Sequence, residues 1–167
     1  ERLFREHRQF DKLTPLGDAN YLRAQLQLAL GEASNARQPL SVIMLDLDAF
    51  SRINREYGHA EGDRLLQVLT QLLLLNLRQH DLLCRLAGDR FVVTLPHTGE
   101  RQAQLLAGEM GQAVRSLAYK SSRQGERIEL SATVVALMAR DENTSSLLQR
   151  LNIAMARAKQ NLTVQYG

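Results

Sequence analysis

Hydrophobic residues recur at two different spacings along the 167-residue chain, and the two spacings separate predicted helices from predicted strands. Residues 18–30 carry leucines at every fourth position, with Asp18 as a candidate N-cap and Gly31 just past the last leucine. This pattern predicts a helix. The run PLSVIMLDLD is short, apolar and contains β-branched residues, so it predicts a buried strand.

The rest of the chain continues to exchange helical and strand patterns. The elements predicted in order are helices over 49–57 and 61–77 joined by GHAEG, a β-hairpin of LLCRL and FVVTL around AGDR, a helix over 99–118 capped by Thr98, the strand IELSATVVALMA, and a closing helix capped by Thr144 or Ser145. This order predicts an α+β domain, in which helices cover the faces of one sheet.

The opening segment, residues 1–10, also has apolar residues at helical spacing. We interpret it as the end of a linker helix that arrives from an upstream domain, with the folded domain over residues 11–167. Because the chain begins with Glu1 rather than Met, it is expected to be a piece of a longer protein.

Composition narrows the classes of protein that fit. Apolar residues make up 44% of the chain, which suits one globular domain, and no apolar run approaches the roughly 20 residues of a membrane span. The single cysteine, Cys84, excludes an internal disulfide and fits a reducing compartment such as the cytoplasm. The formal net charge of +3 is compatible with a phosphate-bearing ligand but is weak evidence for a nucleic-acid surface, so no nucleic-acid partner is expected.

Carboxylates gather where a strand and the hairpin turn are predicted to end. Asp46 and Asp48 are two residues apart at a strand's end, so both project to the same face, and Asp89 lies in the hairpin turn. Mg²⁺ takes one or two protein carboxylates and completes its shell with phosphates and water. Two such ions can assist nucleotidyl transfer. The alternative interpretation is that Asp46 and Asp48 cap the following helix.

The stretch DLDAFSRINREYGHAEGD, followed by RQHDLLCRLAGDRF, resembles the GGDEF family, the diguanylate cyclase domains that condense two GTP into cyclic di-GMP. The positions in register are Asp46, Asp48, Phe50, Asn54, Gly58, His59, Gly62, Asp63, Arg78, Asp81, Gly88, Asp89 and Phe91. FDKLTPL and AMARAKQ extend the resemblance from Asp11 to about Lys159. It implies a palm-like nucleotidyl-cyclase fold with a central, mostly antiparallel sheet.

The sequence departs from the family pattern at the catalytic hairpin, which here reads Ala87, Gly88, Asp89, Arg90 and Phe91. Arg90 replaces an acidic residue and places a permanent cation where Mg²⁺ is expected. Ser51 and Arg55 replace a phosphate-contacting lysine and an aspartate of the pattern. No hairpin residue is therefore expected to be catalytic. Asp46, Leu47 and Asp89 would be vestigial metal positions, and Mg²⁺ would matter only for residual GTP binding.

The resemblance leaves two nucleotide sites to consider. Asn54 and Asp63 would read the guanine of GTP, because an amide and a carboxylate complement the guanine edge, and Lys159 is a candidate phosphate contact. Alternatively, Asn54 faces solvent and Asp63 N-caps the helix after Gly62.

The second site is the pair Arg78 and Asp81, which matches the family's inhibitory R-x-x-D site for cyclic di-GMP. An arginine fork donates to guanine or phosphate, and a carboxylate accepts from the opposite guanine edge. The alternative is a plain surface ion pair at i,i+3 spacing.

These observations favour a catalytically inactive domain that acts as a cyclic di-GMP receptor in bacterial biofilm signalling. Two alternatives remain open. One is a weak cyclase that uses Asp46 and Asp89. The other is a structural or GTP-binding module that controls an attached output domain, such as a phosphodiesterase. An upstream sensor, a downstream output domain and a second copy of the chain are the other expected partners.

Overall fold

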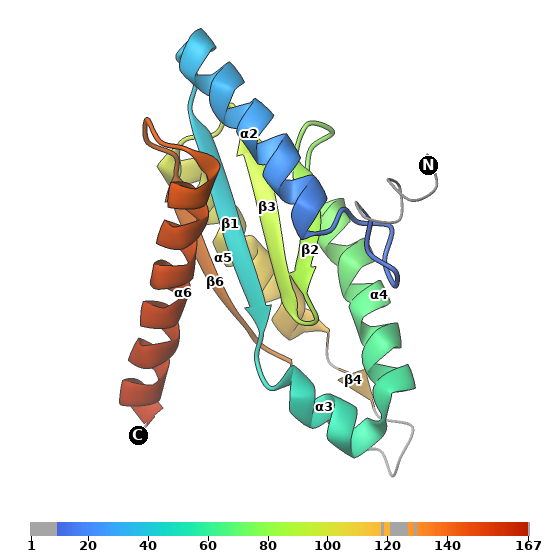
Figure 1. The fold of residues 1–167 in the computed structure, drawn as a ribbon. Coiled ribbons are helices and arrows are strands. Elements are labelled where there is room, and N and C mark those ends of the chain that lie inside the picture. The colour runs from blue at the N-terminus through green and yellow to red at the C-terminus, as the bar shows by residue number, and fades with distance from the viewer. Residues whose placement is uncertain (1–9, 118, 121–126, 129, 167) are drawn as a thin grey trace.

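The computed structural model describes residues 10–117, 119–120, 127–128 and 130–166. Its centre is a four-stranded sheet in the order β2-β3-β1-β6, in which every neighbouring pair is antiparallel. The strands are β1 (Leu40–Leu47), β2 (Leu82–Ala87), β3 (Arg90–Pro96) and β6 (Ala132–Met138) (Figure 1). A second, two-stranded sheet joins β4 (Tyr119–Lys120) to β5 (Arg127–Ile128).

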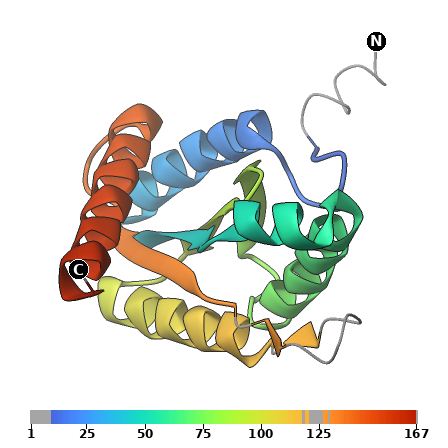
Figure 2. The ribbon, with the colours of Figure 1, turned by 90° about the horizontal axis from the view of Figure 1, so that it is seen from below.

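Helices cover both faces of the central sheet. They are α2 (Ala19–Ala36), α3 (Phe50–Tyr57), α4 (His59–Leu75), α5 (Glu100–Ser116) and α6 (Thr144–Tyr166). Helices α2 and α6 pack on one face, whereas α3, α4 and α5 contribute to the core on the other (Figure 2). The predicted fold class and the order of the major elements are therefore confirmed.

Strand β1 lies at the centre because all eight of its residues are buried. Its side chains alternate between the two cores, with Ile43 and Leu45 in one and Val42 and Met44 in the other. A strand covered on both faces reads as a continuous apolar run, which explains the pattern of PLSVIMLDLD. The same strand carries Asp46 to one end of the sheet.

Several predicted boundaries are wrong. Asp18 caps α2 by accepting a hydrogen bond from the Tyr21 amide, as predicted, but Gly31 lies within the helix. The helix ends where Arg37 adopts a left-handed conformation, with φ of 54°. The stretch GHAEG is not a connection, because only Gly58 separates α3 from α4. Gly58 has a φ of 89°, which a glycine adopts at little cost.

The predicted caps of the last two long helices are also wrong. Gly99 is the N-cap residue of α5, and the Thr98 hydroxyl instead donates to the Pro96 carbonyl. At the start of α6, the Asn143 side chain accepts from the Ser146 amide, which is the cap role assigned to Thr144 or Ser145. The segment IELSATVVALMA contributes to two strands, β5 and β6, rather than one. Most of the predicted linker helix lies outside the described residues, and Phe10 forms an isolated β-bridge with Gly17.

Candidate functional site

The end of the sheet that carries the hairpin turn brings three predicted site residues together. Asp46 in β1 pairs in register with Arg90, the first residue of β3. A two-residue turn of Gly88 and Asp89 joins β2 to β3, and the Asp89 carbonyl accepts a hydrogen bond from the Leu47 amide at 2.9 Å. The backbone therefore fixes the turn against the end of β1.

Asp46 is held by two cations from different elements. The Arg90 guanidinium binds it as a fork, with Nε to Oδ1 and Nη2 to Oδ2 both at 2.7 Å. The Lys159 ammonium of α6 lies 2.6 Å from the same Oδ2. Arg90 Nη1 also donates to the Asn152 side chain of α6 at 3.3 Å. The cluster of Asp46, Arg90 and Lys159, called here the hairpin cluster, ties β1, β3 and α6 together.

Burial and charge act in opposite directions on Asp46. Its side chain is only 3% exposed, whereas Arg90 is 29% and Lys159 47% exposed. Burial raises the pKa of the Asp46 carboxyl, but the hydrogen bonds and charges of Arg90 and Lys159 outweigh it and hold the pKa below its ordinary value. The hydrogen bond with Asp46 also raises the pKa of Arg90. Asp46 and Arg90 are therefore both ionised over the physiological range.

Asp48 has other partners. Its Oδ1 accepts from the Thr133 hydroxyl and its Oδ2 from the Ser131 hydroxyl, both at 2.9 Å. Ala49 is the N-cap residue of α3 and no side chain caps that helix. The alternative that Asp46 and Asp48 cap this helix is therefore wrong.

The donor set at this end of the sheet does not fit Mg²⁺. Both carboxylate oxygens of Asp46 are already bound by cations, and a metal ion would have to displace the Arg90 fork while lying beside its positive charge. Within the described part of the chain, no group of three or more histidine, cysteine, aspartate or glutamate residues could hold a metal ion. Asp46, Leu47 and Asp89 do lie close together, but the carboxylate of Asp46 binds Arg90 rather than standing free for a metal ion.

A second arginine, Arg85, stabilises the hairpin through contacts that the sequence patterns did not reveal. Arg85 donates to the Gly88 carbonyl through Nη2 at 2.8 Å and to both carboxylate oxygens of Asp11 through Nη1. Asp11 also accepts from the amide and hydroxyl of Thr14. The aspartate of FDKLTPL and the arginine of LLCRL were the only signal in the sequence, and they are 74 residues apart. Ala87 ends β2 without a positive φ, so alanine costs little there.

Asn54 and Gly62 lie against each other where α3 meets α4. A Cβ atom on Gly62 would lie 1.9 Å from Asn54 Oδ1, so any larger residue there would force the Asn54 side chain to move. Asn54 Oδ1 is buried and makes no hydrogen bond with the described residues, which is uncommon for a buried acceptor. Asn54 therefore does not simply face solvent. Asp63 is exposed within α4, five residues after Gly58, so the capping alternative is wrong.

Arg78 and Asp81 meet in the loop between α4 and β2. Asp81 accepts from the Arg78 amide at 2.8 Å and from the guanidinium Nε and Nη2 at 3.2 and 3.1 Å. Arg78 Nη2 also donates to the carbonyl of Pro96, the last residue of β3, and to the Thr98 hydroxyl. The Asp81 side chain is 2% exposed and the Arg78 side chain 50% exposed. The loop therefore presents an arginine held from below by a buried carboxylate, here called the loop pair.

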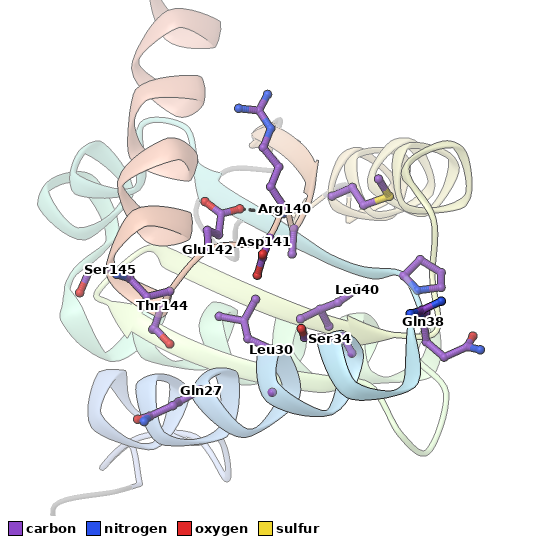
Figure 3. A pocket seen from close by; sticks show the side chains of 17 residues that line it. Gln27, Leu30, Ser34, Gln38, Leu40, Arg140, Asp141, Glu142, Thr144 and Ser145 are labelled. Carbon is purple, nitrogen blue, oxygen red and sulfur yellow. Dashed lines mark hydrogen bonds between the residues drawn. The ribbon is translucent and has the colours of Figure 1, made fainter.

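A hollow of about 950 Å³ lies elsewhere, between the C-terminal half of α2 and the start of α6 (Figure 3). Leu30 and Leu40 form part of its apolar wall, and Asp141 and Thr144 are among its polar groups. None of the predicted site residues lines this hollow. The hollow lies at the opposite end of the sheet from the hairpin turn. Leu40, the first residue of β1, lines it, whereas Asp46 lies near the other end of the same strand.

Comparisons with known proteins agree with the fold. The family model described as "Diguanylate cyclase, GGDEF domain" matches residues 8–164. A diguanylate cyclase of Vibrio cholerae serotype O1 is 33% identical over 151 residues, which cover 90% of this chain and 46% of the relative. The chain spans less than half the length of this and the other curated relatives that it matches first.

Solved structures give the same result. The GGDEF domain of YfiN (TpbB) from Pseudomonas aeruginosa superposes with a TM-score of 0.82 at 30% identity, covering 91% of this chain and 89% of that one. The GGDEF domain of DgcB from Caulobacter crescentus, solved in complex with cyclic di-GMP, has a TM-score of 0.86, covering 92% and 91%. Its identity is 20%, so that likeness concerns the fold alone.

No helix in the described ranges is long and apolar enough to cross a membrane.

Proposed function

Because the chain belongs to the GGDEF family of diguanylate cyclase domains, we propose that it is a non-catalytic member that acts as a regulatory receptor for cyclic di-GMP. The observation that carries the non-catalytic part is the Arg90 fork on Asp46, at 2.7 Å on both oxygens. A cyclase of this family needs carboxylates that are free for Mg²⁺. Here the carboxylate at the strand end is bound by Arg90 and Lys159 instead.

Loss of the metal site removes more than one ligand. Two metal ions stabilise the charge that develops on attacking and leaving oxygens during nucleotidyl transfer. A fixed guanidinium at Asp46 supplies positive charge, but it cannot bind an oxygen and lower its pKa as a metal ion does. Ser51 also takes the position of a phosphate-contacting lysine in the family pattern. The domain therefore has neither the ligands nor the phosphate contact for turnover.

The receptor part rests on the loop pair of Arg78 and Asp81. Asp81 orients the guanidinium through two of its nitrogens, so Arg78 loses little conformational freedom when a ligand arrives. Arg78 Nη1 makes no hydrogen bond with the described residues, and half of the side chain faces solvent. A guanine edge or a phosphate of cyclic di-GMP suits these outward donors.

Two measurements on the purified domain test the proposal. With GTP and Mg²⁺, chromatography should detect no cyclic di-GMP above background, and steady product formation that Asp46→Ala abolishes would refute the non-catalytic part. Calorimetry should detect cyclic di-GMP binding, which Arg78→Ala weakens by about 1.5–3 kcal/mol, or roughly 10- to 150-fold.

Arg140→Ala is the matched control for the titration. Arg140 is exposed just after the end of β6, at the opposite edge of the sheet from β2, and it lies at the rim of the hollow rather than near the loop pair (Figure 3). This variant should bind cyclic di-GMP as the wild type does. A flat titration of folded wild-type protein would leave the loop pair as a structural ion pair and refute the receptor part.

A second candidate function is binding of GTP without turnover, with the base at Asn54 and Asp63. The observation that favours it is the buried Asn54 Oδ1 with no hydrogen-bond partner. A guanine N–H would satisfy this acceptor, and the exposed Asp63 carboxylate would accept another. Calorimetry with GTP and ATP tests this candidate, because ATP offers no N1–H donor. Equal affinity for the two nucleotides would exclude it.

A further inference from the structure

In the hairpin cluster, the two cations are exposed to solvent and the carboxylate is buried beneath them. Asp46 is 3% exposed beneath Arg90 at 29% and Lys159 at 47%. A diffusing metal ion therefore meets two positive groups before it reaches the carboxylate oxygens. A diffusing anion meets N–H donors whose direction the carboxylate has already fixed. This position therefore favours anions, whereas a metal site favours cations.

Arg90 has donors left over for a ligand. The guanidinium carries five N–H groups, of which Nε–H and one on Nη2 bind Asp46, and one on Nη1 binds Asn152. One N–H on each terminal nitrogen is not used in these bonds. Two N–H groups on a fixed guanidinium can donate to the oxygens of a phosphate group. Asp46 thus orients the Arg90 guanidinium and leaves two of its N–H groups for a ligand.

We propose that the hairpin cluster is a phosphate site that works without a divalent cation, so that Arg90 and Lys159 bind a nucleotide's phosphate groups directly. The inference deepens the second candidate function, because it gives the phosphates of a guanine nucleotide a place beside its base. Helix α3, which carries Asn54, begins three residues after β1 ends, at the same end of the sheet as Arg90 (Figure 1).

The cationic N–H donors of Arg90 and Lys159 carry this attraction, and the nearby carboxylates oppose it. Asp46 cancels one of the two cations, and Asp89 in the adjoining turn also interacts electrostatically with Arg90. The Asp48 carboxylate is turned to the hydroxyls of Ser131 and Thr133. Removal of the Asp46 charge should therefore strengthen anion binding, whereas it would abolish binding through a metal. The two hypotheses predict opposite signs for one substitution.

The experiment is a calorimetric titration with GTP, ATP and inorganic tripolyphosphate, each in EDTA and each with Mg²⁺. GTP should bind in EDTA at least as tightly as with Mg²⁺, because the metal neutralises the phosphates that the cations recognise. Arg90→Gln should weaken binding in EDTA roughly tenfold or more, the scale of one charged hydrogen bond. Asp46→Asn should strengthen it several-fold, and Arg140→Gln should leave it unchanged.

The outcomes separate this inference from the candidate function on which it rests. GTP binding only with Mg²⁺, or binding in EDTA that Arg90→Gln does not change, overturns the phosphate site and leaves the guanine site standing. No binding of any of the three ligands overturns both. Binding of tripolyphosphate in EDTA that depends on Arg90, with no preference for GTP over ATP, supports the phosphate site and excludes the guanine site. If Arg90→Gln does not fold, Asp46→Asn decides, because weaker binding in EDTA overturns the inference.

Discussion

Two arginine–aspartate pairs of the molecule have similar contacts, but one joins residues far apart in the sequence and the other joins close neighbours. In both, the carboxylate is almost fully buried and the arginine is partly exposed, at 29% for Arg90 and 50% for Arg78. The Arg90–Asp46 pair joins residues 44 apart on two strands, and Lys159 adds a helix. The Arg78–Asp81 pair closes a loop within three residues.

The difference lies in what each pair replaces and what each leaves available. The Arg90–Asp46 pair occupies the position of a metal site, and its hydrogen bonds hold three elements together. The loop pair uses a local carboxylate to aim an arginine whose exposed side is open to a ligand. Under the proposed function, one arginine site serves a ligand, and the other lies where the family pattern predicts a metal ion. On the same proposal, the first pair replaces the metal site and contributes to stability, and recognition of cyclic di-GMP depends on the second pair.

The largest expected effect is a gain of activity at the hairpin. Arg90→Glu alone should give little or no cyclic di-GMP, because it restores an acidic ligand while Ser51 and Ala87 remain. The combination with Ser51→Lys and Ala87→Gly should produce more, since it also restores a phosphate contact and backbone clearance. Chromatography of the reaction with GTP and Mg²⁺ measures the product. Brisk turnover by Arg90→Glu alone would show that the other departures matter little.

The second prediction compares the two pairs by their contribution to stability. Arg90→Ala leaves the buried Asp46 carboxylate with Lys159 alone, and it should lower the free energy of unfolding by about 2–3 kcal/mol. Arg78→Ala should cost about 1 kcal/mol or less, because the guanidinium is half exposed and the Arg78 amide still binds Asp81. Urea unfolding at neutral pH measures both.

A double variant controls for the buried charge in that comparison. Arg90→Ala combined with Asp46→Asn should recover part of the loss, because no ionised carboxylate remains to be desolvated. If Arg78→Ala proved as costly as Arg90→Ala, the distinction between a long-range and a local pair would be wrong.

The sequence predicted the fold well because local pattern and family motif agreed. The run from Leu40 to Leu47 and the hairpin were found at their observed places, since a buried strand and a two-residue turn are encoded locally. Helix ends were less predictable. Gly31 and Thr98 are ordinary end signals, but the first lies within a helix and the second binds Arg78. A tertiary contact accounts for Thr98, whereas nothing in the structure explains why α2 continues past Gly31.

The contacts among the predicted site residues could not be predicted from the sequence. The sequence predicted Arg90 as a cation that opposes a metal, and Lys159 as a candidate phosphate contact. It did not indicate that both bind Asp46, because their separation along the chain hides the convergence of β3 and α6 on β1. The burial of Asn54 Oδ1 was equally invisible, since it depends on the close approach of Gly62.

A third pair, Arg85 with Asp11, sharpens the comparison through pH. Burial raises the pKa of Asp11, but hydrogen bonds from Thr14 and Arg85 outweigh it and lower the pKa from 3.8. A carboxyl whose pKa is lower in the folded state stabilises the protein above its unfolded pKa, and this contribution is lost as pH falls through the folded pKa. Arg85→Gln should therefore cost most near neutral pH, and its cost should shrink below pH 3.8.

Urea unfolding of the wild type and Arg85→Gln at a series of pH values checks this. A stability difference that stayed constant down to about pH 2 would mean that Arg85 acts through the Gly88 carbonyl rather than through the charge of Asp11.

The smallest expected effect is the salt dependence of the two pairs. In about 1 M NaCl the Debye length falls to about 3 Å, so ions screen charges that solvent reaches. The cost of Arg78→Ala should then fall by a few tenths of a kcal/mol, because half of that side chain is exposed. The cost of Arg90→Ala should change less, since Asp46 lies beneath its cations and is 3% exposed. Urea unfolding of both variants at low and high salt measures the difference, and equal shrinkage would mean that solvent reaches Asp46 as readily as it reaches Arg78.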